Sequence, residues 1–569
     1  MSEQNFEQEM RSALEESKPC PPRVSVVIED GIIKSLVEGA VVPNVDFATF
    51  FTEAWQKNAN RTVMIDTMSG SRYTYGEMLD ACRRVAAGLR RRGLRTADVV
   101  AFHGANSCEL LVAICGTFFA GGTAALIKTN LTEGEVHNQL VDARPKFVFC
   151  DADDIEKIQQ SCAGISSVED IIVATGDPGR APSLSQLKQT PLDDLGATHN
   201  VCPDTVLVII YSSGTTGLPK GVQLTHRNVV ALAAMFGLTD QSAFNKDDIF
   251  MNIAPVKHIG GFTSIFGHLG QGACVVLVHK LDFGVILSGI ATYKPTSILL
   301  FPTFVAKLVE HPLLDKVDMS SIKKLLIAGT TASSSLLRGI TLKLGLKGVI
   351  QVYGMTELSG CIAYSIPRMD DFKSVGTPAP FVEIKVVDES TRKPLGPYEL
   401  GEICVKSPGG FKGYLNNPKA TAATYENDFV RTGDVGHYSP DGRIFVCGRL
   451  KELIKCMDQQ VAPAELEELL AADPGVLHAV VAGVPHPQFG EAARAFVLPR
   501  KRLLPGSAEE KMEAQRLQDL VAGNLAAHKH LHGGVEFLES VPQNSAGKDL
   551  RTSLKEMYIQ KHCKDSTTE

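Results

Sequence analysis

The residue types that bind phosphate are concentrated in one segment of the chain, between positions 211 and 221. Gly214 and Gly217 allow the backbone to approach a ligand closely, since glycine carries no side chain. Hydroxyl and backbone N–H groups can then donate hydrogen bonds to phosphate oxygens, and Lys220 adds a positive charge. The segment predicts a site for nucleotide phosphates. It reads Tyr211-Ser212-Ser213-Gly214-Thr215-Thr216-Gly217-Leu218-Pro219-Lys220-Gly221.

The spacing of this loop differs from that of a Walker loop. A Walker loop reads G-x-x-x-x-G-K-[ST] and opens directly into a helix. Here Gly214 and Gly217 are only three positions apart, and Lys220 is followed by Gly221. The expected helix also begins later in the chain. The segment is therefore predicted to be a different kind of phosphate loop.

The neighbouring elements place this loop at the end of a core strand. The aliphatic run over residues 206–210 is typical of a buried strand. After the loop, Thr225 is a candidate N-cap for a helix over residues 226–235. The loop is thus expected to be held by a rigid strand on one side and followed by a capped helix.

The rest of the chain alternates between helical stretches and short apolar strands from Phe47 to about Phe445. This alternation predicts an α/β fold with layered, largely parallel sheets. Between residues 381 and 406 the strands run closer together, which predicts a small β unit. We expect residues 1–45 to form an extension with a short hairpin, and residues 46–447 to form a large domain. The clearest expected strands cover residues 99–102, 147–149, 171–173, 297–300 and 324–327.

A smaller α+β domain is expected over residues 448–569. Pro463 is suited to the first turn of a helix that continues to Ala471. Ser507 and Glu510 have the spacing of a capping box for a long helix. The expected strands cover residues 478–484, 493–498 and 535–538, and a loop with Lys548 precedes a final helix.

Composition restricts the class of protein. The chain has 569 residues, which predicts more than one domain, and 21% of them are charged, which is typical of a soluble globular enzyme. The net charge of −7 argues against a nucleic-acid partner. The uncharged run from Leu110 to Ile127 approaches the length of a membrane span. We interpret it as a buried helix, a turn and a short strand, and expect no transmembrane segment.

The 13 cysteines are scattered singly, with no C-x-x-C pair, so neither a zinc site nor a disulfide framework is indicated. Residues 1–19 lack the apolar core of a signal peptide. The chain ends Ser566-Thr567-Thr568-Glu569, which is not a Ser-Lys-Leu peroxisomal signal. These features predict a cytoplasmic protein. The sequence leaves the oligomeric state open.

The phosphate loop resembles the AMP-binding signature of the adenylate-forming superfamily, which includes acyl-CoA synthetases, beetle luciferases and the adenylation domains of peptide synthetases. Further motifs resemble those of the coumarate–CoA ligase and beetle-luciferase branch, in order over nearly the whole chain. These motifs are Gln351-Val352-Tyr353-Gly354-Met355-Thr356-Glu357, Arg431-Thr432-Gly433-Asp434, Gly448-Arg449-Leu450-Lys451-Glu452-Leu453-Ile454-Lys455, Gln460-Val461-Ala462-Pro463-Ala464-Glu465-Leu466-Glu467 and Ala546-Gly547-Lys548.

The resemblance implies ATP-dependent activation of a small carboxylic acid, with Mg²⁺ and then CoA as further reactants. A carboxylate attacks the α-phosphate of ATP, and pyrophosphate leaves. The carboxylate is already ionised at neutral pH, so no general base is required. The barrier comes from bringing an anion to a polyanion, so we expect catalysis by positioning, cations and N–H donors.

The resemblance also implies roles for individual residues. Residues 212–220 would cradle the phosphates, and Tyr353 would stack on adenine. Asp434 would accept hydrogen bonds from both ribose hydroxyls, and Lys548 would stabilise the developing negative charge. Thr356 would bind phosphate, and Mg²⁺ would be held by Glu357 and Thr215. The remaining expected cofactor-binding residues are Gln351, Gly354, Arg449 and Lys451.

In this family the small domain swings after adenylation, and a second face then completes thioester formation with CoA. Residues 449–451 would lie next to the hinge, and Lys455 would serve the second half-reaction. Gly448 stands at the hinge position, which is usually Asp or Lys. Met457-Asp458 replaces a Lys-Gly pair that lies against the pantetheine arm, so Asp458 would bring a negative charge towards an anionic cofactor.

The expected acyl pocket contains His258, which matches a family histidine at the edge of the acyl site. Gly260 stands where coumarate–CoA ligases have tyrosine, and Val352 replaces a usual glycine. Thr330-Thr331 replaces small residues. This pocket is not that of a hydroxycinnamate ligase, and an apolar acid such as a fatty acid is expected.

Three functions remain open at this stage. The first is an ATP-dependent acid:CoA ligase. The second is an adenylating enzyme with a different second step, such as transfer to a carrier-protein thiol or luciferase-type oxidation. The third is a nucleotide-binding regulator without turnover, which Met457-Asp458 favours and the retention of Glu357, Asp434 and Lys548 opposes.

Overall fold

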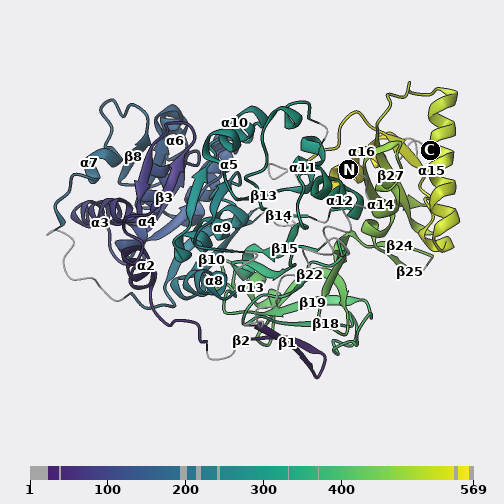
Figure 1. Ribbon diagram of the computed structural model, residues 1–569, viewed down its shortest axis with the longest axis horizontal. Coiled ribbons are helices and arrows are strands. Elements are labelled where there is room, and N and C mark those ends of the chain that lie inside the picture. Colours follow the sequence, from purple (N-terminus) through teal and green to yellow (C-terminus); the bar gives the residue numbers. More distant parts are fainter. Residues whose placement is uncertain are drawn as a thin grey trace.

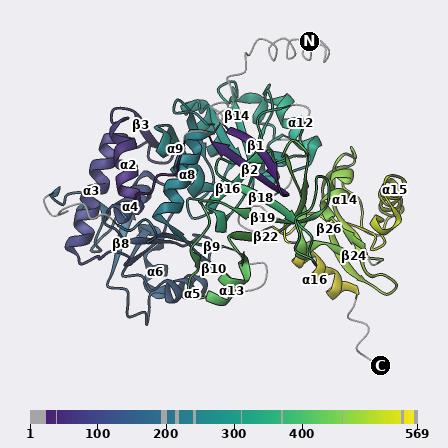
Figure 2. The same cartoon turned by 90° about the horizontal axis from the view of Figure 1, so that it is seen from below.

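A computed structural model gives the chain a layered α/β architecture with a separate C-terminal domain at one end of the molecule (Figures 1 and 2). The predicted fold class is confirmed. The structure describes residues 24–37, 40–192, 201–212, 219–239, 244–309, 311–330, 332–368, 371–457, 459–543 and 549–562.

The first sheet carries the strand that leads into the phosphate loop. In the described part of the chain its order is β20-β10-β9-β6-β5-β7-β8. Strands β5 to β9 pair in parallel, whereas β10 is antiparallel to both β9 and β20. Its strands are β5 (Val99–His103), β6 (Thr123–Leu126), β7 (Phe147–Asp151), β8 (Asp170–Thr175), β9 (Val206–Ser212), β10 (Lys220–Thr225) and β20 (Gly413–Tyr414).

The second sheet lies beside the first and has the order β17-β16-β15-β14-β13-β11-β12-β3-β4 among the described residues. Its central strands pair in parallel, and β4, β16 and β17 add antiparallel edges. Its strands are β3 (Thr62–Asp66), β4 (Arg72–Thr74), β11 (Ile249–Asn252), β12 (Cys274–Leu277), β13 (Ser297–Leu300), β14 (Lys324–Ala328), β15 (Ile350–Met355), β16 (Gly360–Tyr364) and β17 (Thr377–Pro378).

The third sheet is antiparallel and includes the N-terminal hairpin. Its order is β1-β2-β18-β19-β22-β21, with β23 paired to β22, within the described ranges. Asp30 and Gly31 make the two-residue turn of the hairpin at φ 52° and 74°. Its strands are β1 (Val24–Glu29), β2 (Ile32–Val37), β18 (Glu383–Val387), β19 (Gly401–Lys406), β21 (Tyr425–Glu426), β22 (Phe429–Tyr438) and β23 (Ile444–Arg449).

The C-terminal domain has its own sheet, with the order β25-β24-β27-β26 and β28 paired to β27 in the residues described. Its own apolar cluster lies beneath this sheet and includes Leu466, Val481 and Leu517. Its strands are β24 (Ile454–Cys456), β25 (Gln459–Val461), β26 (Val476–His486), β27 (Gly490–Pro499) and β28 (Val535–Phe537).

Helices cover the sheets, and two of them connect the first sheet to the second. Helix α8 packs against β9 and β10, and α9 packs against β11 and β12. The two helices also pack on each other, because Gly267 of α9 leaves room for the ring of Phe236 of α8. The α-helices are α2 (Phe47–Gln56), α3 (Tyr75–Arg91), α4 (Cys108–Phe119), α5 (Glu133–Ala143), α6 (Ile155–Ser161), α7 (Leu184–Leu187), α8 (His226–Leu238), α9 (Ile259–Gln271), α10 (Phe283–Tyr293), α11 (Pro302–Val309), α12 (Ser334–Lys343), α13 (Pro418–Thr424), α14 (Pro463–Ala471), α15 (Ala508–Asn524) and α16 (Arg551–His562).

The predicted elements largely match these bounds. Thr225 is the N-cap of α8, with a reciprocal capping box to Asn228, and Pro463 lies in the first turn of α14. The uncharged run forms buried α4, a turn and β6, as predicted. None of the helices in the described ranges has the length and apolar character needed to cross a membrane.

Two local features differ from the prediction. The residues after the phosphate loop form strand β10, which the sequence pattern did not indicate because the strand is short and begins with Lys220 and Gly221. At α15, Ser507 accepts from the backbone of Glu510, but the Glu510 carboxylate binds Gly506 N at 2.6 Å instead of completing the capping box.

Candidate active site

The phosphate loop connects two adjacent antiparallel strands of the first sheet. Ser212 ends β9, Lys220 begins β10, and these two residues are direct partners across the ladder. The two ends of the loop are therefore held side by side. The predicted phosphate-binding residues Ser213, Gly214, Thr215, Thr216 and Gly217 lie outside the described residues.

A cation, a phenol and a carboxylate lie next to the loop, and we call Lys220, Tyr414 and Glu357 the Glu357 group. Lys220 Nζ lies 5.0 Å from the centre of the Tyr414 ring. The Tyr414 hydroxyl donates to Glu357 Oε1 at 2.7 Å. Burial and then the charge of Glu357 raise the pKa of Tyr414, so its hydroxyl remains a donor. No pattern in the sequence predicted Tyr414, because Tyr414 reaches this position through the pairing of β20 with β10.

Glu357 has the surroundings of a cation ligand. It lies in a short turn that follows β15, starts with Thr356 and leaves only 8% of Glu357 exposed. Mg²⁺ is usually held by one or two carboxylates together with substrate phosphates. A single buried carboxylate beside the ends of the phosphate loop fits that pattern.

A second group of side chains, Tyr353, Asp434 and Arg449, converges on the buried carboxylate of Asp434, which is 4% exposed; we call it the Asp434 group. The Tyr353 hydroxyl donates to Asp434 Oδ2 at 2.6 Å, and Arg449 Nε lies 2.7 Å from Asp434 Oδ1. Burial acts to lower the pKa of Arg449, but nearby negative charge, that of Asp434 first, outweighs it and raises that pKa. The guanidinium therefore stays charged beside the carboxylate.

The two groups lie close together because both Tyr353 and Glu357 come from the end of β15. A Cβ atom at Gly354 would meet the Gly360 carbonyl of β16, so only glycine allows this approach of the two strands. Gln351 on the same strand donates to the carbonyls of Phe372 and Ser374 at 3.1 and 2.8 Å. Its side chain therefore fastens a neighbouring segment to β15.

The expected acyl side of the site is centred on His258, the N-cap of α9. His258 Nδ1 accepts from Gly260 N at 3.1 Å, and its ring lies edge-on to Phe301, 6.2 Å between centres. Burial, and then the charge of Lys128, lower the pKa of His258 to about 4, so this imidazole is neutral at pH 7. A Cβ atom at position 260 would lie 3.3 and 3.7 Å from His258 Nδ1 and Cε1, and no other described atom outside its own helix lies within 4 Å.

The other predicted pocket residues lie on neighbouring strands. Thr330, two residues after β14, is half-buried, and so is Val352 within β15. Thr331 lies outside the described residues. Gly329, at φ 100°, lies against the Phe301 ring, where a Cβ atom would be 3.0 Å from Cδ1. No pattern in the sequence predicted Phe301. This residue follows β13 and comes next to Gly329 through the parallel pairing of β13 with β14.

A polar cluster lies behind His258, at the carboxyl ends of β5 and β7. Lys257 is 2% exposed and His103 fully buried. Burial lowers the pKa of Lys257 to about 8, against the opposing effect of Asp151 and Asp154. His103 Nε2 lies 3.5 Å from Asp154 Oδ2. No local pattern in the sequence predicted this cluster, because its members come from three separate segments: the end of β5, the end of β7 with the turn after it, and the loop before α9.

Of the predicted residues of the small domain, Arg449 belongs to the Asp434 group. Lys451 and Lys455 are exposed. Met457 has φ 53° in the two-residue turn between β24 and β25, a conformation that favours glycine or asparagine. Asp458 and Lys548 lie outside the described residues. Gly448, the expected hinge, has φ 154°, and a Cβ atom there would meet no atom of the described residues within 4 Å.

One helix of the small domain contacts the large domain directly. Both Glu468 oxygens, from α14, accept from Ser334 N at the start of α12, at 3.1 and 3.2 Å. Ser335 Oγ donates to the Ala471 carbonyl at 3.3 Å. The small domain is therefore docked by the positive end of a large-domain helix.

The chain belongs to the AMP-binding enzyme family: residues 51–415 match the AMP-binding enzyme family, and residues 465–548 match the AMP-binding enzyme C-terminal domain. It is 32% identical over 506 residues to 4-coumarate-CoA ligase 1 of Narcissus pseudonarcissus, covering 87% of this chain and 91% of the relative. It is 32% identical over 498 residues to luciferin 4-monooxygenase of Photuris pensylvanica, covering 86% and 90%.

Solved structures show the same architecture. ATP-bound MatB from Rhodopseudomonas palustris matches with a TM-score of 0.79 and 28% identity, over 90% of this chain and 99% of that one. The ATP-bound RpMatB-BxBclM chimera B3 matches with a TM-score of 0.80 and 28% identity, over the same shares of the two chains. The predicted resemblance to adenylate-forming enzymes is confirmed.

Proposed function

We propose that the protein activates a carboxylic acid with ATP to an acyl-adenylate and then transfers the acyl group to CoA. The observation that carries the proposal is the convergence of the Glu357 group and the Asp434 group beside the fixed ends of the phosphate loop. One group offers a cation and a carboxylate, as Mg²⁺-bound phosphates require. The other offers a buried acceptor flanked by an aromatic ring, as a nucleoside requires.

In the first step a carboxylate oxygen of the acid attacks the α-phosphorus. The bond to pyrophosphate breaks, and its electron pair leaves with pyrophosphate. Lys220 offsets negative charge near the loop, and Asp434 and Tyr353 hold the nucleoside, so the work of these residues is positioning and charge stabilisation. Mg²⁺, when held by Glu357 and the phosphates, neutralises charge on the leaving group.

In the second step the CoA sulfur attacks the acyl carbonyl carbon, and the bond to AMP breaks. Lys455 is proposed to serve this step. Met457 supports the view that this step is the weaker one, since it occupies a left-handed turn position at φ 53° beside the expected pantetheine path. A different acceptor is the second candidate, which the similarity to luciferin 4-monooxygenases supports.

The acid is proposed to be apolar and monocarboxylic, such as a fatty acid. Neutral His258, the Phe301 ring and the absence of a side chain at Gly260 support a pocket of different shape from one closed by tyrosine. Turnover of an acid panel tests this: medium- and long-chain fatty acids should exceed coumarate in kcat/KM. A higher value for coumarate would contradict the pocket assignment.

ATP–pyrophosphate exchange tests the function itself. Exchange should require Mg²⁺ and an acid, and Lys548→Ala should lower it at least about a hundredfold, the scale seen when one charge-stabilising donor is removed. Lys561→Ala is the matched control, because Lys561 is an exposed lysine of the same domain, paired with Glu536. A wild-type protein that binds ATP without exchange would be a nucleotide-binding regulator. Product analysis with and without CoA separates ligation from another second step.

A further inference from the structure

Strand β22 is bulged where it carries Asp434. On one side of the bulge Glu402 of β19 pairs with Val435, and on the other Cys404 pairs with Arg431. One residue of β19, Ile403, therefore faces three residues of β22, positions 432–434. The position of Asp434 depends on what holds this bulge in shape, because the regular ladder is interrupted there.

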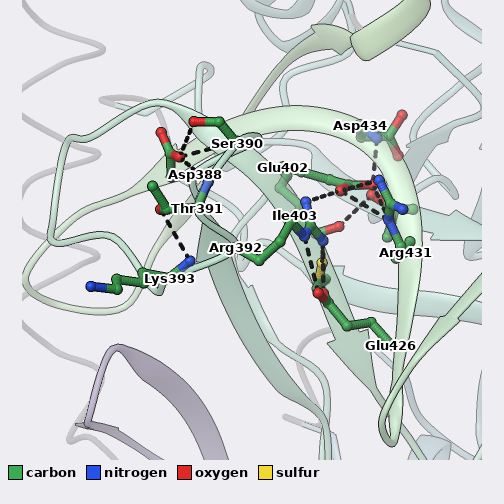
Figure 3. A network of polar contacts seen from close by, with 12 residues as sticks. Asp388, Ser390, Thr391, Arg392, Lys393, Glu402, Ile403, Glu426, Arg431 and Asp434 are labelled. Atoms are coloured by element: carbon green, nitrogen blue, oxygen red, sulfur yellow. Dashed lines mark hydrogen bonds and ion pairs between the residues drawn. The ribbon is translucent and has the colours of Figure 1, made fainter.

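Side chains replace the missing ladder bonds. Thr432 Oγ1 donates to the Ile403 carbonyl at 2.7 Å and accepts from Asp434 N at 3.0 Å. Glu402, only 2% exposed, reaches from one side of the bulge to the other and accepts from Arg431 Nη2 at 3.0 Å. The carboxylate of Glu402 thus closes the bulge, as Figure 3 shows.

Arg392 is the second partner of this buried carboxylate. Its Nη1 donates to Glu402 Oε2 at 2.6 Å, while Nε and Nη2 donate to Glu426 at 3.0 and 2.7 Å (Figure 3). Glu426 belongs to β21, which pairs with β22 just before the bulge. One guanidinium therefore connects the strands on both sides of β22.

The backbone at Arg392 supports a specific role for this side chain. Its φ is 58°, a left-handed conformation that suits glycine and is unfavourable for a long side chain. Arginine at such a position is stable only where its contacts outweigh the strain. The planar fork allows simultaneous bonds to two carboxylates, which a lysine cannot reproduce.

We propose that Arg392 is a positioning residue for the nucleotide: it fixes Glu402, which closes the bulge that presents Asp434. The inference rests on the proposed nucleotide-binding role of Asp434. Arg392 itself does not touch Asp434. Its effect should therefore fall on nucleotide binding, and the chemical step and the acid should be little affected, because uniform loss of substrate binding raises KM and leaves kcat unchanged.

The test compares Arg392→Gly, Arg392→Lys and Glu426→Gln in ATP–pyrophosphate exchange. Arg392→Gly relieves the backbone strain and removes the fork, and should raise the KM for ATP about tenfold with kcat and the KM for the acid within about twofold. Arg392→Lys should rescue this only in part. Glu426→Gln keeps the bond to Glu402 and should change the KM for ATP less than Arg392→Gly does.

Lys406→Gln is the matched control. Lys406 lies on β19, as Glu402 does, but it pairs with exposed Asp428 at 3.2 Å. The inference is overturned if Arg392→Gly lowers thermal stability alone, or changes both KM values and kcat alike. If Arg392→Gly does not fold, Arg392→Lys decides the test by the same comparison of the KM for ATP with kcat and the KM for the acid.

Failure of the proposed function has a different signature, namely wild-type protein without exchange. The affinity of the same variants for ATP, measured by calorimetry, is then compared in place of the KM. Weaker ATP binding by Arg392→Gly supports the inference, and unchanged binding overturns it.

Discussion

The nucleotide side of the large domain and the candidate residues of the small domain are built in opposite ways. Asp434 and Glu357 are 4% and 8% exposed, and each is held by a hydroxyl donor from another strand. Lys451 and Lys455 are exposed, and the backbone N–H of Lys455 donates to Glu491 Oε2 at 3.3 Å. The first set is buried and held in place, whereas the second is open to solvent.

This difference bears on the two steps of the proposed reaction. Side chains fixed in a sheet are suited to holding one ligand throughout, because moving them would break several buried bonds at once. The described contact between the domains at Glu468 is small by comparison, so on the proposed function the small domain is the part expected to move between steps. Substitutions in the two regions should therefore give separable effects.

The largest effect is expected from Asp434→Ala. It removes the proposed acceptor for both ribose hydroxyls and the carboxylate beside Arg449. The kcat/KM for ATP in pyrophosphate exchange should fall about a hundredfold or more, as expected for two hydrogen bonds to a charged group. Asp428→Ala, at an exposed residue just before β22, is the control. An affinity for ATP within threefold of wild type would show that Asp434 does not hold the ribose.

Acid should destabilise the large domain through its buried histidines. His226 Nδ1 accepts from Phe47 N at 3.1 Å, and burial lowers the pKa of His226 to about 4 from 6.5. The unfolded chain binds more protons over this interval, so stability is fully present above pH 6.5 and is lost as pH falls towards 4.

His226→Gln keeps an acceptor that does not titrate. It should therefore remove about 2 kcal/mol of the pH-dependent loss at pH 5, roughly thirtyfold in the unfolding equilibrium. Urea unfolding at pH 5 and pH 7.5 measures this. His562→Gln, at an exposed histidine of the small domain, should leave the pH dependence unchanged. Parallel pH dependence in wild type and His226→Gln would contradict the assignment.

The step that uses CoA should respond to the turn between β24 and β25. Changing Met457→Lys together with Asp458→Gly restores a cation and removes a carboxylate beside the expected CoA path. The kcat/KM for CoA should rise by about a factor of ten or more, because each of the two charge changes contributes about 1 kcal/mol. Pyrophosphate exchange should stay constant. Micromolar use of CoA by wild type, with no gain in the double variant, would exclude this role.

The smallest effect concerns domain docking. Glu468→Ala removes the carboxylate that accepts from Ser334 N at the start of α12, and should weaken docking about fivefold, the usual scale for one hydrogen bond to a free N–H of a helix start. The rate of trypsin cleavage after exposed Lys451 measures it. Glu465→Gln is the control on the same helix, because Glu465 pairs with Lys529 inside the small domain at 2.7 Å. Equal cleavage rates in wild type and Glu468→Ala would show that this contact does not hold the domain.

Local patterns in the sequence predicted what depends on neighbouring residues. The hydrophobic run of β9, the cap at Thr225 and the motifs around Glu357 and Asp434 are continuous segments, and their types and spacing are visible directly. Tyr414 and Phe301 were not predictable, because strand pairing brings them to the site from distant segments. Arg392 was not predicted for a further reason. An arginine in a polar turn looks like an ordinary surface residue, and only the structure shows that its partner Glu402 is buried.

The N-terminal hairpin has a consequence for solubility. Strand β2 pairs with β18 through residues 32–34, and Ile33 is fully buried there. Removing the hairpin would uncover the N–H and C=O groups of β18 together with an apolar patch. An uncovered edge of this kind is a template for pairing with another chain. The hairpin thus acts as a built-in shield against aggregation, and a shortened chain without it should self-associate even where its ATP site is intact.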